Sequence, residues 1–487
     1  MPRTPSSAPS TSWDIVIGLE VHAQIASTSK LFSRTSTQPF ADANSSVSLI
    51  DAAMPGMLPI PNQKCIDQAI TTALAFDADI QHVSLFDRKH YFYPDLPQGY
   101  QISQYHKPIA LGGHITIDDD KGQPKDIPLT RLHIEQDAGK SLHDLFPHAT
   151  AIDLNRSGVG LMEIVFEPSL RSSGEAVSLM HAIRQLLRYL GTCDGNMEAG
   201  NLRADVNVSV RQPHEPLGTR CEIKNLNSMR FIQQAIDYEA QRHISLREKG
   251  QTITQQTRLF NTNTQRTYAM RSKEEAHDYR YFPDPDLPPL VLDPARIQKL
   301  KEQLPERPRE KYQRFLKDYG LKKDDVALLV AERDIAQFFE ETARTTNPVQ
   351  AARWVIGPLF ALLNKRQTPI QDSPISPQRL SALIDAVEDG TLSERTAKDV
   401  LITMATSGKT ARDIIQQENL AQISDDNVLN AKIHALLQAH PDKVTAYQQG
   451  KTRLLGFFVG EIMRETKGKA HPQKVNALLQ EKLKKAP

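Results

Sequence analysis

The spacing of apolar residues changes near residue 292, and this change limits the possible folds more than any other feature of the sequence. Before it, short runs alternate between apolar and polar residues and turn residues are frequent, as in antiparallel strands. After it, apolar residues recur at helical spacing. Prolines crowd the stretch 283–294 between the two patterns. Because proline restricts both its own backbone and the preceding residue, we expect an extended segment there that ends a domain.

We expect an α+β chain that is long enough for several domains. With 487 residues, roughly three domains of ~150 residues are expected. We predict a loose N-terminal tail, a sheet-containing domain, a helical domain and a small helical tail domain, at residues 1–12, 13–292, 293–408 and 409–487.

Local signals within the helical half predict individual elements. Ser393 is a predicted N-cap for a helix that ends near Gly408. The proline-flanked stretch 368–377 is expected to join two helical bundles.

Composition excludes several classes of protein. Lys and Arg total 59 against 58 Asp and Glu, a formal charge of +1, so the chain has no global basic coat for nucleic acid. The three cysteines, Cys65, Cys193 and Cys221, lie far apart and form no disulfide framework or CxxC zinc site, which fits a reducing compartment. No apolar run approaches the ~18 residues of a membrane helix. We therefore expect a soluble cytoplasmic protein without a membrane partner.

The C-terminal segment from Lys451 is locally basic, with nine Lys and Arg against three Glu. A solvated helix face and a surface for RNA phosphates both fit this charge pattern.

Four predicted strands share an unusual pattern: one face is apolar and the other mixes carboxylates, imidazoles, amides and cations. The polar residues at alternate positions are Glu20, His22 and Gln24; Arg131, His133 and Glu135; Arg203, Asp205, Asn207, Ser209 and Arg211; and Arg220, Glu222 and Lys224. Alternate side chains stand on one side of a strand about 7 Å apart. Each strand alone could simply have its polar face in water. Together they hold the ligands for a divalent cation and the cations for a phosphate, with Mg²⁺, Mn²⁺ and Zn²⁺ all compatible.

Three motif-like stretches do not carry chemistry. Gly408-Lys409-Thr410 and Gly450-Lys451-Thr452 lack the upstream glycine and the preceding strand of a phosphate-binding loop, so any ATP site is of another kind. The stretch 191–195 resembles the elbow of a cysteine amidotransferase, but a helical pattern precedes it. We predict a helix–strand turn there, since an elbow follows a strand.

At these same strands the chain resembles the B-subunit family of the aspartyl/glutamyl-tRNA amidotransferases. The matching blocks run from about residue 13 to the end, at 18–24 with 29–32, 54–59, 89–104, 133–140, 155–165, 222–228, 271–283, and 456–460 with 466–470.

The resemblance implies a catalytic cradle domain with a glutamine-synthetase-like fold and an antiparallel sheet, a helical domain and a small tail that contacts tRNA. It also implies an ATP-dependent carbon–nitrogen ligase that takes its amide nitrogen from glutamine. ATP would phosphorylate the side-chain carboxylate of Glu on tRNA(Gln) or Asp on tRNA(Asn), and ammonia would displace phosphate. Because the chain holds no glutaminase signature, the implied partners are the family's glutaminase, which is its A-subunit, together with its small C-subunit.

Site residues follow from the matched motifs. The resemblance and the strand faces favour Glu20, His22 and Glu135 as metal ligands for Mg²⁺. Roles in catalysis are expected for Asp205 and Glu222, which would complete the ion's shell or deprotonate ammonium, and for Lys224 and Arg203, which would contact phosphate. The lysines expected to contact tRNA are Lys451, Lys467, Lys469 and Lys474. No residue is assigned to the nucleotide. Two other functions remain open at this point: a non-catalytic tRNA scaffold and a free-standing ligase for a small acid.

Overall fold

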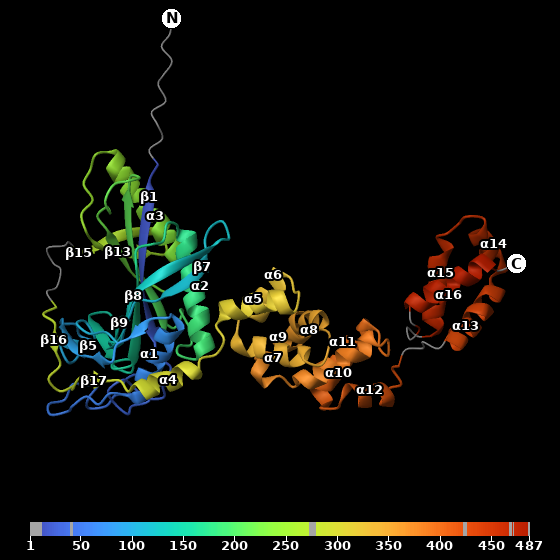
Figure 1. Cartoon of the computed structure of the whole chain (residues 1–487), viewed down its shortest axis with the longest axis horizontal. Helices are drawn as coiled ribbons and strands as arrows, with labels where there is room; N and C mark the ends of the chain where they lie inside the picture. The colour runs from blue at the N-terminus through green and yellow to red at the C-terminus, as the bar shows by residue number, and fades with distance from the viewer. Residues whose placement is uncertain are drawn as a thin grey trace, which may run out of the picture. The chain divides into compact units, whose positions relative to one another are not determined.

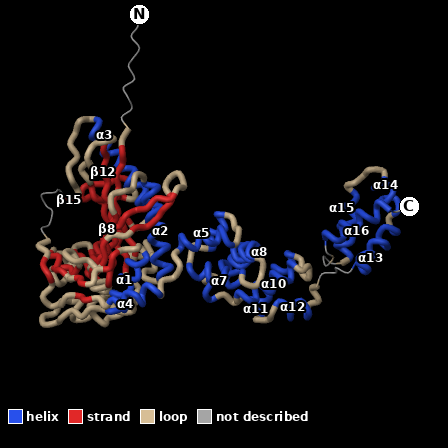
Figure 2. Tube along the Cα trace, in the orientation of Figure 1, coloured by secondary structure: helices blue, strands red, loops and turns tan. Residues whose placement is uncertain are grey.

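The computed structural model describes residues 12–38, 42–271, 279–421, 426–466, 470 and 472–485. Its internal contacts divide the chain into two compact units, with the boundary between residues 307 and 308. The first unit is rich in strands and the second is helical (Figures 1 and 2). The mixed α+β composition and its order along the chain are as predicted, whereas the domain boundaries at 292 and 408 stay predictions.

One large sheet dominates the described part of the first unit. Its order is β15-β14-β13-β12-β1-β11-β8-β6-β2, with β7 paired to β8. The strands span Asp14–Gln24 (β1), Asp79–Ile80 (β2), Ala110–Leu111 (β6), His114–Asp118 (β7), Pro124–Gln136 (β8), Gly160–Phe166 (β11), Leu202–Arg211 (β12), Cys221–Leu226 (β13), Thr257–Asn261 (β14) and Arg266–Arg271 (β15). The pairs are antiparallel except β13 with β14.

Three smaller sheets accompany it. They are β16-β4-β5, β10-β9 and β17-β3. Their strands span Val83–Ser84 (β3), Asp87–His90 (β4), Tyr100–Ser103 (β5), Lys140–Phe146 (β9), Ala149–Asp153 (β10), Phe282–Pro283 (β16) and Leu290–Val291 (β17). The proline-rich stretch is therefore extended, as predicted, but both of its short strands pair back onto the first unit.

Two long helices bury one face of the main sheet. They are α2 (Ser173–Leu190) and α3 (Met229–Glu248). The apolar face of β1 is predicted from its alternation and confirmed by burial: Ile17, Leu19 and Val21 are fully buried in the core to which both helices contribute. Because strand side chains alternate, the polar residues of the same strands lie on the opposite face. That face carries the candidate site.

The ends of α2 follow from its sequence. Ser172 caps the helix by accepting a hydrogen bond from the Glu175 amide, and Gly191 ends it in the left-handed conformation at φ 67°. This confirms the predicted helix–strand turn at 191–195. Two further helices, α1 (Gln63–Ala75) and α4 (Pro294–Glu302), contact each other in the first unit, where Arg296 forms an ion pair with Asp67.

The elements of the second unit are helices in the part that the structure describes. Its helices span Pro308–Asp318 (α5), Lys323–Leu329 (α6), Arg333–Ala343 (α7), Pro348–Trp354 (α8), Phe360–Arg366 (α9), Pro377–Glu388 (α10), Glu394–Ser407 (α11), Ala411–Gln417 (α12), Asp426–Ala439 (α13), Pro441–Gln448 (α14), Leu454–Glu465 (α15) and Pro472–Lys485 (α16). A π-helical turn at Val355–Leu359 joins α8 to α9, and a 3₁₀ turn at Ile370–Asp372 follows α9.

Two predictions for this unit have different outcomes. Ser393 caps α11 by accepting from the Thr396 amide, and Gly408 ends the helix at φ 70°, as predicted. The expectation that 368–377 separates two bundles is wrong, because α10 packs against α7 and α8 on the other side of that stretch. The last four helices, α13 to α16, share an apolar core that includes Leu429, Phe458 and Leu479. Among the described helices, none has both the length and the apolarity that a membrane crossing requires.

Candidate active site on the open face of the main sheet

Strand register brings the polar residues of four strands into one row. His22 on β1 lies opposite Glu163 on β11 and opposite Arg203 on β12. Glu163 in turn lies opposite His133 on β8, and Glu135 follows two residues later on the same face. The central strands of the sheet therefore gather two carboxylates and two imidazoles on the face away from α2 and α3.

Three of these side chains form a group that could hold a metal ion. The ligand atoms of His22, Glu135 and Glu163 all lie within 4.8 Å of one another. Nε2 of His22 is 3.4 Å from a Glu163 oxygen and 3.8 Å from a Glu135 oxygen. Nε2 of His133 is 3.3 Å from Glu163 and 3.6 Å from Glu135, and the Ser103 hydroxyl donates to Glu135 at 3.2 Å. We call these four residues, His22, His133, Glu135 and Glu163, the carboxylate–imidazole cluster.

Charges within the cluster shift its pKa values in opposite directions. Burial disfavours a charged imidazole, but the neighbouring carboxylates outweigh this and raise the pKa of both His22 and His133 to about 9. Burial would raise the pKa of Glu163, yet the two imidazoles hold it well below its usual range. Burial and the negative charge of Glu163 oppose ionisation of Glu135, and His133 and Lys89 nevertheless lower its pKa. The two carboxylates are therefore held ionised, and His22 has to release its proton before its Nε2 can coordinate a cation.

Glu20 lies on the same face but outside the three-ligand group. It faces Asp205 across the β1–β12 pair, and its Oε1 accepts a hydrogen bond from Nδ2 of Asn207 at 3.0 Å. Burial, together with the negative charges of Glu163, Glu222 and Asp205, raises the pKa of Glu20. The structure thus brings His22 and Glu135 together with Glu163, while the predicted role of Glu20 as a ligand stays a prediction.

The four residues predicted to act in catalysis fall into two ion-paired groups. Lys224 donates to Asp205 at 3.0 Å and to Glu222 at 2.5 Å, and the Asn225 amide donates to Asp205 at 2.8 Å. Asn225 has a φ of 60°, a backbone conformation that asparagine adopts more readily than most residues. Burial opposes ionisation of Asp205, but Lys224 and His22 lower its pKa.

Arg203 belongs to the second group, around Asp137. It donates to Asp137 at 3.3 Å, Arg156 approaches the same carboxylate at 3.3 Å, and Gln24 donates to it at 3.1 Å. Arg203, Arg156 and Gln24 also line a cavity of about 890 Å³ whose walls are otherwise mostly polar and include Lys140. The cavity adjoins the row of site residues, since Gln24 and Arg203 belong to both.

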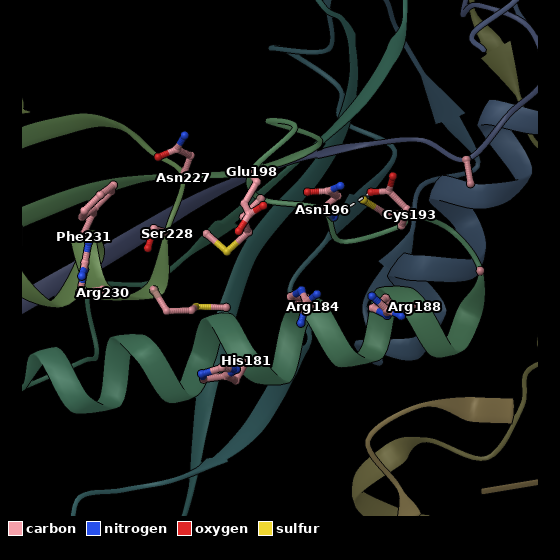
Figure 3. Close-up of a pocket in the computed structure, with 15 residues that line it drawn as sticks. His181, Arg184, Arg188, Cys193, Asn196, Glu198, Asn227, Ser228, Arg230 and Phe231 are labelled. Atoms are coloured by element: carbon pink, nitrogen blue, oxygen red, sulfur yellow. Dashed lines mark hydrogen bonds between the residues drawn. The ribbon is translucent and has the colours of Figure 1, made fainter. Parts of the chain in front are cut away.

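A larger cavity of about 1370 Å³ lies between α2, the loop at 193–198 and the start of α3 at 227–231 (Figure 3). Arg184 and Arg188 of α2 line it, together with Cys193. Burial raises the pKa of Cys193 to about 12, which keeps it a thiol and not a nucleophilic thiolate. This agrees with interpreting 191–195 as a turn.

The lysines predicted to contact tRNA lie in the second unit. Lys451 is exposed just before α15, and Lys474 is exposed on α16, where its Nζ is 3.2 Å from Asp426. Lys467 and Lys469 lie outside the described residues.

Sequence reasoning gave no role to Glu163, although it lies within one of the matching blocks. It is the only ionisable residue in the strand Gly160–Phe166, and a single carboxylate in an apolar strand is a signal that could have been used. The sequence analysis also assigns no role to Lys89. Burial opposes its charge, but Glu135 and the groups around it raise the pKa of Lys89.

Comparison with known proteins places most of the chain in a family. A family model described as "GatB/GatE catalytic domain" matches residues 15–298, and one described as "GatB domain" matches residues 337–483. A relative from Methylobacterium nodulans is 55% identical over 471 residues, 97% of this chain and 96% of the relative. Relatives from Granulibacter bethesdensis and Rickettsia bellii are 53% and 51% identical over 475 and 474 residues, 98% and 97% of this chain and 98% of each relative. Each of the three is named as the B-subunit of an aspartyl/glutamyl-tRNA(Asn/Gln) amidotransferase.

Proposed function

Because the chain belongs to the family of aspartyl/glutamyl-tRNA(Asn/Gln) amidotransferase B-subunits, we propose that it activates the side chain of a mischarged aminoacyl-tRNA. As a member of this family it is a subunit of an ATP-dependent ligase that acts on tRNA. In the proposed reaction, ATP phosphorylates the side-chain carboxylate of Glu-tRNA(Gln) or Asp-tRNA(Asn). Ammonia then attacks the acyl phosphate, phosphate leaves, and the amide forms.

The observation that carries this proposal is the carboxylate–imidazole cluster on the open face of the sheet. A carboxylate anion resists attack by ammonia, and its own charge repels the γ-phosphate of ATP. A site for this chemistry therefore needs fixed positive charge and a place for a divalent cation beside it. The row of residues on β8, β11, β1 and β12 supplies both.

The donor set of His22, Glu135 and Glu163 fits a divalent cation. Two carboxylates and one imidazole come within 4.8 Å of one another, and carboxylate oxygens are the ligands that Mg²⁺ prefers, whereas the imidazole also suits Mn²⁺ or Zn²⁺. When bound there, the ion would supply Lewis-acid charge that offsets the repulsion between the two anions. Glu20 remains a proposed additional ligand on the same face.

The other charged residues are assigned to phosphate contact and to proton transfer or ion binding. We assign the contact with phosphate to Arg203, which faces the cavity of about 890 Å³ beside Arg156. Lys224 remains a second proposed phosphate contact; it now donates to Asp205 and Glu222, as Arg203 does to Asp137, so each cation would exchange a carboxylate for a phosphate oxygen. Asp205 and Glu222 would complete the shell of the ion or accept a proton from incoming ammonium.

The remaining parts of the proposal concern architecture and partners. We propose that the first unit is a cradle with a glutamine-synthetase-like fold, and that the second comprises a helical domain and a tRNA-binding tail. The ammonia comes from a glutaminase, the A-subunit, which assembles with this chain together with a small C-subunit.

The deciding experiment is ATP cleavage by the complex reconstituted with the A- and C-subunits. We expect cleavage that depends on both Glu-tRNA(Gln) or Asp-tRNA(Asn) and Mg²⁺, with amide formed in the same reaction when glutamine is present. A complex that binds tRNA but cleaves no ATP would leave only a scaffold. Cleavage with free glutamate in place of the charged tRNA would indicate a ligase for small acids.

Removing the tail is expected to weaken tRNA binding and spare the chemistry. Because α12 packs on α10 and α11, the truncation should follow residue 421 so that this bundle stays intact. Losing several phosphate contacts should raise the KM for tRNA at least about tenfold near physiological salt and make binding less salt-dependent. ATP cleavage at saturating tRNA should stay within about twofold. An unchanged KM would contradict the tRNA role of the tail.

A further inference from the structure

Five tyrosine rings form a chain of contacts beside the candidate site. In order they are Tyr105, Tyr281, Tyr279, Tyr91 and Tyr93, and successive ring centroids are 4.1, 6.0, 6.2 and 6.0 Å apart. We call this set the tyrosine belt. Its five residues lie in the segments that flank the strands of the small sheet β16-β4-β5. Contacts at these distances are favourable for aromatic pairs, so the belt is an ordered surface and not a set of unrelated side chains.

Both ends of the belt are open to solvent. Tyr105 is 46% exposed and Tyr93 is 51% exposed. Next to Tyr93, the Phe92 ring is 86% exposed and lies against the backbone of Gly99, where a Cβ would come within 3.1 Å of it. Exposed aromatic rings gathered in one place typically mark a binding surface, whereas single exposed rings do not.

The middle of the belt adjoins the carboxylate–imidazole cluster. Lys89 lies between the two, with its Nζ 5.0 Å from the Tyr279 centroid and 5.9 Å from the Tyr91 centroid. Strand β5 connects them, because it pairs with the strand that carries Lys89 and its Ser103 donates to Glu135. The belt and the cluster are therefore neighbours within the first unit.

The surroundings of the belt favour an anionic, base-bearing ligand. The Arg131 guanidinium lies 5.8 Å from the Tyr105 centroid, and the exposed Lys107 follows two residues after Tyr105. Cations thus lie beside the Tyr105 end and the middle of the belt. Proteins hold single-stranded nucleic acid with bases stacked on aromatic rings and phosphates near cations.

We propose that the tyrosine belt and Phe92 form the stacking platform for the unpaired nucleotides at the 3′ end of the tRNA. The inference rests on the proposed function, because the amino acid attached to that end has to reach the cluster for its side chain to react. Stacking tolerates any base, so one platform serves both the glutamine and the asparagine tRNA.

The test measures the affinity for tRNA and asks whether removing a ring matters only when the 3′ nucleotides are present. The full complex binds deacylated tRNA(Gln), either intact or without its unpaired 3′ nucleotides. Tyr93→Ala and Phe92→Ala should each weaken binding of intact tRNA roughly 5- to 100-fold and leave binding of the trimmed tRNA unchanged. Tyr93→Phe keeps the ring and should bind like wild type. The matched control is Tyr268→Ala, which removes a ring 49% exposed on β15 of the main sheet and should affect neither tRNA.

Equal effects of Tyr93→Ala on intact and trimmed tRNA, or no effect on either, would overturn the platform. So would a loss of the A- and C-subunits from the purified complex without any change in tRNA binding, since the rings would then be a protein interface. Phe92→Ala guards against misfolding, because that ring is almost fully exposed. Amidation by wild type is measured in the same preparation to separate the two claims. If wild type amidates but the ring variants affect intact and trimmed tRNA equally, only the platform is refuted. If the ring variants weaken intact tRNA alone but the complex cleaves no ATP, only the proposed function is refuted.

Discussion

Replacing Glu163 with glutamine is expected to lower ATP-dependent amidation by about two orders of magnitude or more. Glutamine keeps the shape of the side chain but removes one of the two negative charges that would hold the cation. A Lewis-acid cation contributes several kcal/mol to such a reaction, and each ~1.4 kcal/mol corresponds to a tenfold change in rate. The measurement is single-turnover ATP cleavage by the complex with charged tRNA at increasing Mg²⁺. Glu135→Ala, which removes the other carboxylate, should have an effect of the same size.

A neighbouring carboxylate provides the control. Glu167 lies just after β11, four residues from Glu163, and its side chain accepts from the Thr130 hydroxyl at 2.7 Å. Glu167→Gln should therefore keep wild-type turnover, while the thermal stability of all variants stays close to that of the parent. Near-normal ATP cleavage by Glu163→Gln would contradict its assignment as a ligand.

Replacing Glu239 with glutamine is expected to cost roughly 3–5 kcal/mol of folding free energy, because it breaks a buried ionic network. Glu239 lies on α3 and is fully buried. Thr267 donates to it at 2.6 Å, and ring and guanidinium nitrogens of His243 and Arg258 lie 3.1 and 3.3 Å away. Arg242 donates to the same carboxylate. Urea unfolding at pH 7 measures the loss, and Glu248→Gln at the exposed end of the same helix should lie within about 0.5 kcal/mol of wild type.

The network also explains a second group of possible metal ligands. Cys221, Glu239 and His243 place their ligand atoms within 4.8 Å of one another. Arg242 and Arg258 already neutralise the carboxylate, and both guanidinium groups would repel a cation there. We therefore interpret this group as a structural connection between α3 and the strands β13 to β15.

The contribution of Glu239 to the free energy of unfolding should decrease at acid pH. Burial opposes its ionisation, but hydrogen bonds from His243, Arg242 and Thr267 outweigh this and lower its pKa in the folded state. The unfolded chain then binds the proton more readily, so this contribution is fully present above about pH 4.5 and decreases as the pH falls below it. The difference in unfolding free energy between wild type and Glu239→Gln should shrink between pH 5 and pH 3. A constant difference over that interval would contradict the network.

Local chemistry made much of the fold predictable. The alternation in β1 identified both its buried and its polar face, and Ser393 and Gly408 marked the ends of α11, because each signal acts within a few residues. The packing of α10 was not predictable in this way. The stretch before α10 has the prolines of a domain linker, whereas the apolar faces that bring α10 against α7 lie far away in the sequence.

The candidate site was likewise predictable only as far as single strands allowed. The polar faces of β1 and β8 were apparent from single strands, but their alignment was not. His22 meets Glu163 only through the β1–β11 register, which is set by pairing between segments about 140 residues apart. Glu163 carries no local pattern of its own beyond being one acid in an apolar strand. That signal singles Glu163 out, but its partners become apparent only when β11 is placed beside β1 and β8.

The most direct test of the account is the position of a divalent cation in crystals of the assembled complex grown with Mn²⁺ and an ATP analogue. Anomalous scattering locates Mn²⁺ independently of any assumption about its ligands. We predict a peak within roughly 2.5 Å of His22 Nε2 and of carboxylate oxygens of Glu135 and Glu163, the range of such bonds in proteins. A peak elsewhere on the complex, with these three side chains contacting only one another, would contradict the account.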